Sequence, residues 1–347
     1  MCNAMDIVRR AAALATGIVL VAGCQTDMGN MLPPTAYGNG TAGARVISVD
    51  ENWNSAEGFP GNLQFTDLTI NSGVTLTLPS GITLRCTGAF TNNGTIIVLP
   101  GVEGGFAGQT GSGGDFSSEA VPPGAGIGTL AAQAGESGDD SSARLGGRGG
   151  FGISEFEARQ VLAVAVPGGG GGATAGSDSS SGVTEISGSA GGGSVRILAA
   201  GSIANGAGAA IRADGEGGRG GGGGGGVVIM ASSTEVRNEG TVSATGGDGE
   251  DGDSNQAPSG GGGGGLVHLL APTISVGTLS VGGGSAGAIG PGVSAVARFG
   301  GGGGGPGAGA GGDGGDVPAG AFSVPTAATA GANGFGISTV VDPEALF

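Results

Sequence analysis

The stretch that decides the fold is residues 191–284, in which one pattern occurs three times. Each copy opens on glycines, continues into a short apolar strand, turns, gives a second strand and returns to glycine. The first strands read VRILA (195–199), VVIMA (227–231) and VHLLA (267–271), and the second strands read IRA (211–213), TVSA (241–244) and TLSV (278–281). The first strands begin 32 and then 40 residues apart. A repeat period in this range is typical of solenoids and repeat arrays.

Glycine accounts for 87 of the 347 residues, far above its usual share. The glycines follow no strict Gly-X-Y period with abundant proline, which excludes a collagen triple helix. Disordered low-complexity chains have a similar composition. The apolar strands that recur between the glycine runs favour a folded protein, because a disordered linker has no reason to carry them.

The formal net charge is −16, and all 12 basic residues are arginine. An acidic surface of this kind argues against binding to nucleic acid, and against a polybasic attachment to anionic lipid. It is typical of a solvated extracellular surface.

Residues 45–100 contain short alternating runs separated by turn residues, which predicts strands about eight residues apart. Their spacing matches that of the later repeats. Phe90 precedes Gly94 by four residues, just as Val236 precedes Gly240. We therefore predict an all-β fold, a right-handed parallel β-solenoid that uses one unit throughout. By this alignment Cys86 is a buried thiol at the inward position of three alanines, which are Ala199, Ala231 and Ala271.

Glycine blocks lie next to strands at 220–226, 260–265 and 300–305. They are either flexible loops or threefold polyglycine-II helices that lie side by side and hydrogen-bond to one another. Because the blocks recur at one point of each coil, each block would have neighbours to bond with. We therefore favour ordered packing.

The chain begins with two arginines, Arg9 and Arg10, followed by the apolar run 11–23, which together are typical of a secretory signal. The run ends in VAGC (21–24), which resembles the lipobox of bacterial lipoproteins. This resemblance implies that residues 1–23 are removed and that Cys24 is acylated. The two or three acyl chains that such a cysteine carries give stable membrane anchoring, whereas one chain would be marginal. The following Gln25 favours the outer membrane over inner-membrane retention. An ordinary signal peptide with an incidental cysteine is the alternative.

The remaining organisation follows from composition. Residues 24–44 read as a flexible tether, 45–100 as an N-terminal solenoid and cap module, 101–190 as Gly/Ser-rich insertions and 191–347 as the glycine-rich repeat region. Within the insertions, Ser154 to Glu157 has the form of a capping box that starts a short helix.

Few residues are candidates for chemistry. Residues 246–251 resemble the opening of a calcium-binding β-roll repeat, and residues 251–255 resemble that of an EF-hand loop. Both depart from their families, because the first occurs only once and the second lacks the turn glycine and the final glutamate. Asp248, Asp251 and Asp253 are therefore weak metal candidates, and a solvated acidic loop is the preferred interpretation.

Two further residues have a structural and a functional interpretation. His268 falls at the outward position equivalent to Arg196 and Val228, without partners for catalysis or metal binding. Trp53 is expected to seal the first coil as a cap, the alternative being carbohydrate stacking.

The repeat style resembles that of glycine-rich, β-solenoid-like surface lipoproteins and adhesin or tail-fibre proteins of bacteria and phages. This resemblance implies a non-catalytic structural or adhesive protein of the bacterial envelope, without a cofactor. The membrane, through Cys24, and glycans or other surface proteins would be its partners.

Two alternatives remain for the function. One is a polysaccharide lyase or hydrolase on a parallel β-helix, with Arg196, Arg212 and Asp214 in its groove. The other is an ice- or mineral-binding face, for which three threonines align, Thr95, Thr241 and Thr278.

Overall fold

A computed structural model describes residues 36–100, 135, 148–162, 175–176, 188–218, 220–252, 257–290, 298–304, 308–317 and 325–347. The predicted signal segment and Cys24 lie outside these residues. Among the helices of the described part, none is long and apolar enough to cross a membrane.

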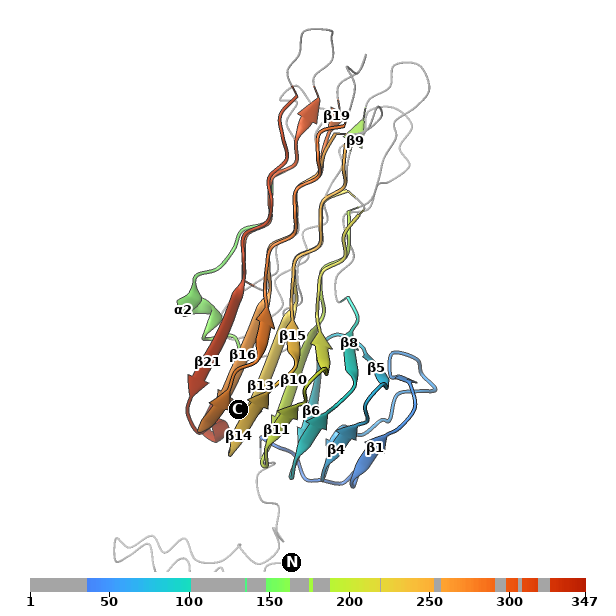
Figure 1. Ribbon diagram of the computed structural model, residues 1–347, viewed down its shortest axis with the longest axis vertical. Coiled ribbons are helices and arrows are strands. Elements are labelled where there is room, and N and C mark those ends of the chain that lie inside the picture. Colours follow the sequence, from blue (N-terminus) through green and yellow to red (C-terminus); the bar gives the residue numbers. More distant parts are fainter. Residues whose placement is uncertain are drawn as a thin grey trace, which may run out of the picture. The chain divides into compact units, whose positions relative to one another are not determined.

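The described chain is a parallel β-solenoid with three six-stranded sheets, as the repeats predict (Figure 1). Each coil contributes one strand to each sheet. The first sheet contains β1 (Arg45–Ile47), β4 (Leu68–Ile70), β7 (Phe90–Asn92), β11 (Ile203–Asn205), β14 (Glu235–Asn238) and β17 (Thr273–Ser275). The second contains β2 (Glu51–Asn52), β5 (Thr75–Leu78), β8 (Thr95–Val98), β12 (Ala210–Arg212), β15 (Thr241–Ser243) and β18 (Thr278–Ser280). The third contains β3 (Gln64–Phe65), β6 (Ile82–Cys86), β10 (Ser194–Ala199), β13 (Val227–Ser232), β16 (Leu266–Ala271) and β21 (Phe335–Val340).

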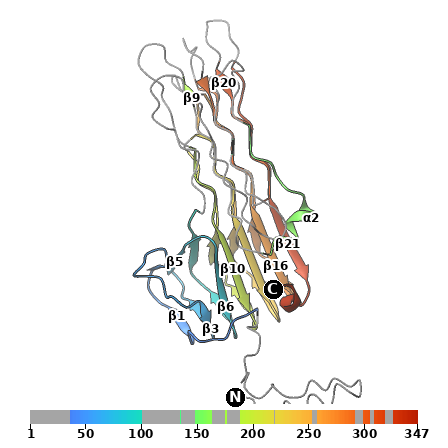
Figure 2. The ribbon, with the colours of Figure 1, turned by 180° about the vertical axis from the view of Figure 1, so that it is seen from behind.

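The strand register confirms that residues 82–98 and 227–244 are the same unit, since Phe90 pairs with Ile203 and Ile203 with Val236. All three sheets run from residues 45–100 into residues 191–347 without interruption, as the view from behind also shows (Figure 2). The 82–98 unit therefore stacks directly on the glycine-rich repeats.

The predicted alignment of the first strands is wrong by one residue in the middle copy. Val195 pairs with Val228, which in turn pairs with Val267, so these strands repeat after 33 and then 39 residues. Cys86 is buried opposite Ala199, as expected, but the next residue in its column is Ser232 and not Ala231. For the same reason, His268 is equivalent to Arg196 and Ile229.

This error has a physical cause, because the strands β10, β13 and β16 of the third sheet are buried on both faces. Its inward side chains join the solenoid core, whereas Leu198, Ile229 and Leu270 belong to a second apolar cluster on its outer face. A strand that is apolar on both faces has no alternation to fix its register.

Residues 148–162 cover part of this outer face. They include α2 (Glu155–Ala158), which begins with the predicted capping box between Ser154 and Glu157. Ala158 and Val161 pack into the outer cluster, and Phe347, just after η1 (Pro343–Leu346), packs against it. Thus part of the predicted insertion 101–190 packs on the outer face of the third sheet.

A small antiparallel sheet is the exception to the parallel topology. It joins β9 (Ala175–Gly176), β19 (Arg298–Phe299) and β20 (Asp316–Val317), which come from two different insertions between coils.

Candidate functional surface

The most distinctive feature of the molecule is a bundle of glycine-rich segments at one corner of the solenoid. In the last four coils, the connection from the second sheet to the third is lengthened: residues 99–193, 213–226, 244–265 and 281–334. We call the described residues of these connections the glycine arms. They continue upward from the strands in Figure 1. All are inserted at the same point of the coil, as the repeat comparison predicts.

The arms are ordered by backbone hydrogen bonds that repeat every third residue. In the segment 259–265 of the third arm, the amides of Ser259, Gly262 and Gly265 donate to the neighbouring segment of the same arm, at residues 250, 247 and 244. The amides of Gly260 and Gly263 donate to a second neighbour, at 301 and 304, and those of Gly261 and Gly264 to a third, at 329 and 332. These bonds are 2.7–3.1 Å long. Three partners in rotation are the pattern of a threefold helix, so ordered packing is confirmed over flexible loops.

Close approach of backbones explains why the arms are glycine. A Cβ atom placed on Gly247 would lie 1.7 Å from the carbonyl oxygen of Glu216, and one on Gly226 would lie 1.8 Å from that of Gly193. Among the described arm residues, only Gly218 and Gly220 have positive φ. Missing side-chain volume, and not backbone conformation, is therefore what most arm positions require.

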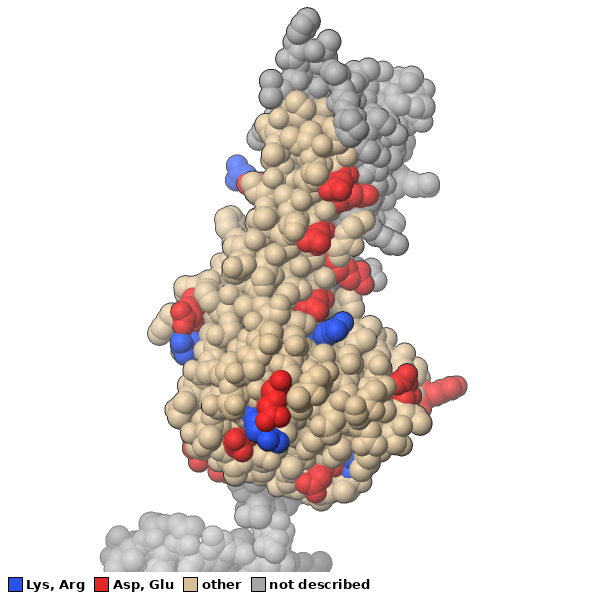
Figure 3. Space-filling view, viewed as in Figure 1, with Lys and Arg blue, Asp and Glu red and all other residues tan. Residues whose placement is uncertain are grey.

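Aspartate side chains act as hydrogen-bond acceptors for the arms, and three of them accept at the same short distance. Oδ1 of Asp214 accepts from the amide of Thr245, and Oδ1 of Asp248 and of Asp251 accept from the amides of residues 285 and 288, each at 2.7 Å. A carboxylate thus takes the place of a carbonyl where the neighbouring segment offers an amide. Figure 3 shows acidic side chains following one another along this face of the arms.

The calcium interpretation gains no support from this arrangement. Asp253 lies outside the described residues, and within the described ranges no three His, Cys, Asp or Glu side chains gather in a way that could hold a metal ion. Asp248 and Asp251 lie one threefold turn apart and each bonds to backbone. Their three-residue spacing, which resembled a metal loop, is the spacing of the glycine helix.

His268 is a buried structural residue. Only 1% of it is exposed, and its Nε2 lies 2.8 Å from Oγ1 of Thr339 on the adjacent strand β21. Burial, helped by the charge of Arg159, lowers the pKa of His268 to about 4. The imidazole is therefore neutral at physiological pH and is covered by other parts of the chain.

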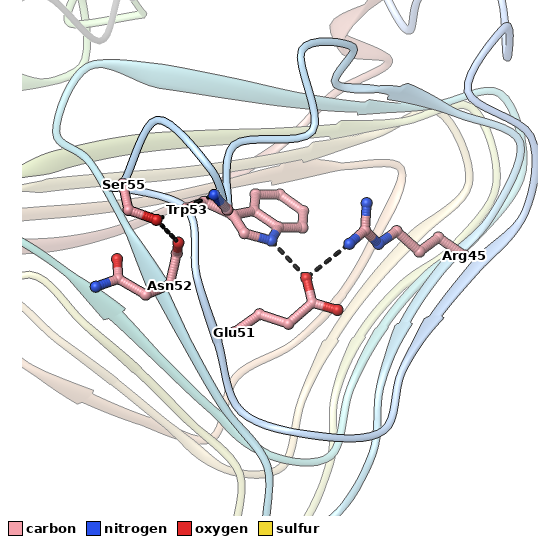
Figure 4. Close-up of polar contacts among 6 residues, drawn as sticks. Arg45, Glu51, Asn52, Trp53 and Ser55 are labelled. Atoms are coloured by element: carbon pink, nitrogen blue, oxygen red, sulfur yellow. Dashed lines mark hydrogen bonds and ion pairs between the residues drawn. The ribbon is translucent and has the colours of Figure 1, made fainter.

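Trp53 closes the first coil. Its Nε1 donates to Oε2 of Glu51 at 2.6 Å, and the same oxygen accepts from Arg45 at 2.7 Å (Figure 4). The Arg45 guanidinium lies 5.2 Å from the centroid of the indole ring, which stacks on Phe65 at 6.2 Å. With 1% of its surface exposed, Trp53 cannot stack on a sugar. The capping interpretation holds and the carbohydrate alternative is wrong.

The residues suggested for an enzyme groove have structural contacts. Arg196, on the outer face of the third sheet, donates to the carbonyl of Leu162 at 2.9 Å and lies over the ring of Phe347. Its pKa is lowered by burial and by the nearby charge of Arg85. Arg212 lies on the second sheet, and Asp214 bonds to Ser243 and Thr245. Arg196 and Arg212 thus belong to strands of different sheets.

The aligned threonines form a column that is broken once. Along the second sheet the register runs Thr75, Thr95, Ala210, Thr241 and Thr278. Thr75 was absent from the sequence alignment because its strand precedes the 82–98 unit. Ala210 occupies the third of the five places, so the column of hydroxyl groups is interrupted there.

The fold and arms together define the class of protein as a parallel β-solenoid that carries a polyglycine bundle. No family model, curated protein or solved structure matches the chain.

Proposed function

We propose that the protein is a lipid-anchored, non-catalytic structural or adhesive protein on the surface of a bacterial envelope. Three features support this proposal. The sequence around Cys24 resembles a lipobox, and the flexible tether expected at residues 24–44 precedes the solenoid, which begins at β1. The arms extend the solenoid at a single corner, which suits a surface that meets partners away from the membrane.

The glycine arms are the observation that carries the adhesive role. Their outward faces present peptide groups and small polar side chains, with exposed carboxylates at Glu216 and Asp248. Peptide amides and carbonyls hydrogen-bond readily to hydroxyl groups. The chemistry of this surface therefore suits the polyhydroxyl chains of glycans.

Membrane anchoring is tested by replacing Cys24 with serine and separating soluble from membrane fractions of the producing cells. Since acylation needs the thiol, Cys24→Ser should move the protein from the membrane to the soluble fraction. Cys86→Ser, which changes a buried thiol outside the lipobox sequence, is the matched control and should stay with the membrane. Unchanged fractionation of Cys24→Ser would reject the anchor.

The adhesive role is tested by screening glycans for binding and for bond cleavage by the same preparation. Binding without cleavage is expected, and it should be weakened by Glu216→Lys in the arms but not by Glu57→Lys in an exposed loop of the first coil. Cleavage of any glycan would favour the enzyme alternative. If the two variants weakened binding equally, the arms would not be the glycan-binding surface.

A further inference from the structure

The last coil of the solenoid forms an end layer, which we define as residues 273–290 and 325–341. It contains β17, β18 and β21, which are the terminal strands of the three sheets. In the described part of the chain, no strand pairs with their outer edges. An edge of this kind presents unpaired amides and carbonyls to any strand that approaches it.

The apolar core is incompletely covered at this end. Ile274 pairs with Val236, and Leu279 with Val242; the two valines are fully buried, whereas Ile274 and Leu279 are only partly buried. Val340 is 73% exposed at the edge of the third sheet. The last coil thus lacks the cover that each earlier coil receives from its successor.

The opposite end differs, because it is closed by its own residues. Trp53 and Phe65 are buried under the first coil, and the ion pair between Arg45 and Glu51 borders them. Solenoids need such atypical terminal coils to remain soluble. The end layer carries no equivalent cap among its described residues.

The end layer is also free of charge. None of its residues is Asp, Glu, Lys or Arg, in a chain whose formal net charge is −16. Natural edge strands are usually protected from pairing by charges or proline. This edge has neither within its strands, so the strand edges themselves carry no charge that would repel another strand.

We propose that the end layer binds the end layer of a second copy of this chain, around a two-fold axis. A two-fold axis places the same patch on both sides, so both surfaces are uncharged and both offer unpaired strand edges. A strand that this axis crosses then runs antiparallel to its own copy across the interface, which allows direct pairing of β17 with β17. Head-to-tail stacking would instead place this neutral surface against the charged first coil.

The test uses the full chain with Cys24→Ser, which removes the predicted lipid site, and measures its mass in solution by light scattering over a range of concentrations. The expected mass is that of two chains. The variant Ser275→Lys/Thr278→Lys/Val340→Lys should have the mass of one chain, because it places charges on all three edges. Val46→Lys is the matched control, since Val46 is 62% exposed and lies at the opposite edge of the first sheet. The residue-by-residue pairing across that sheet leads from Val46 to Ser275, so the two positions are equivalent in their coils.

Four results would overturn the proposal. The first is a single-chain mass for the starting protein at every concentration, as when its own N-terminal segment covers the edge, and the second is an unchanged dimer in the triple variant. The third is dissociation by Val46→Lys as well, which indicates head-to-tail stacking, and the fourth is a mass above two chains. Hydrogen exchange of the starting protein provides a measurement that needs no variant to fold. Amides in residues 273–280 should become more protected as the concentration rises, and concentration-independent exchange there contradicts the proposal.

Discussion

At the scale of single residues, a buried column of asparagines holds the coils together. Nδ2 of Asn92 donates to Oδ1 of Asn205 at 2.8 Å, and Nδ2 of Asn205 donates to Oδ1 of Asn238 at the same distance. Each side chain also donates to a carbonyl of the next coil, at Ala210, Thr241 or Thr278. The side-chain amide of each of these buried asparagines therefore has hydrogen-bond partners, which avoids the cost of about 1–3 kcal/mol for an unsatisfied group.

The buried imidazole of His268 should make stability depend on pH. Its pKa is about 4 in the folded protein and near 6.5 in the unfolded chain, so the unfolded state binds the proton more readily between these values. Stability must then fall as the pH drops below about 6.5, by about 2 kcal/mol at pH 5. Denaturant unfolding of the native protein and of His268→Gln at pH 8 and pH 5 measures this.

The glutamine variant should lose less stability between these two pH values, because it has no group to protonate at this position. Other titrating groups are common to both proteins and cancel in the difference. Equal losses in the two proteins would contradict a depressed pKa at His268.

At the scale of elements, the glycine arms are predictable from sequence in outline and not in detail. The glycine blocks recur at a fixed point of each coil, so each block is expected to have other blocks beside it to hydrogen-bond with. This repetition indicates ordered packing. The pairing of a glycine segment with three neighbouring segments depends on distant residues, such as the bond between Gly263 and Gly304. Nothing local in a run of glycines encodes which neighbour lies on which side.

Alanine substitution separates arm positions that need glycine from those that do not. Gly247→Ala places a methyl group 1.7 Å from a backbone oxygen, so it should lower the free energy of unfolding by about 1–3 kcal/mol or more. At Gly282→Ala the nearest atom to the new methyl is 3.9 Å away, and φ is not positive. That variant should be neutral or stabilising by about 0.4–1 kcal/mol.

Denaturant unfolding measures both variants, and hydrogen exchange locates the damage. Loss of protection should concentrate in residues 213–226 and 244–265, with β5 and β8 unaffected. Equal stability of Gly247→Ala and Gly282→Ala would show that the arms tolerate side chains and are not tightly packed.

At the scale of the whole molecule, the sequence was sufficient for the solenoid and its repeating unit. The alternation of apolar and polar residues in strands such as β5 predicts the strands, and the four-residue spacing from Phe90 to Gly94 identifies the repeating unit. Both signals lie within a few residues of sequence. The cover over the third sheet was not predictable, because it depends on Ala158 and Val161 meeting strands that come much later in the chain. The same two-sided burial also concealed the correct register of β13.

The large negative charge should make the folded protein sensitive to salt. Carboxylates three residues apart on a threefold helix are about 9 Å apart, within the screening length of about 10 Å at 0.1 M salt. Raising sodium chloride from about 0.01 to 0.3 M should therefore raise the melting temperature by about 2–4 °C, on the order of 1 kcal/mol.

Asp248→Asn/Asp251→Asn is the matched variant, because asparagine keeps the accepting oxygen and removes the charge. It should gain less from salt than the starting protein. A melting temperature that falls with salt would mean that attractive ion pairs, such as that between Arg45 and Glu51, outweigh the repulsion.

The side-chain-free packing of the glycine arms has a consequence for how the protein responds to temperature. Unfolding of the arms exposes peptide groups and little hydrocarbon. Since hydration of apolar surface raises the heat capacity and that of polar surface lowers it, the arms add little to the heat-capacity change of unfolding. Their stability curve is therefore flatter than that of an apolar core of the same size. Cooling, which weakens hydrophobic cores, should leave the arms intact.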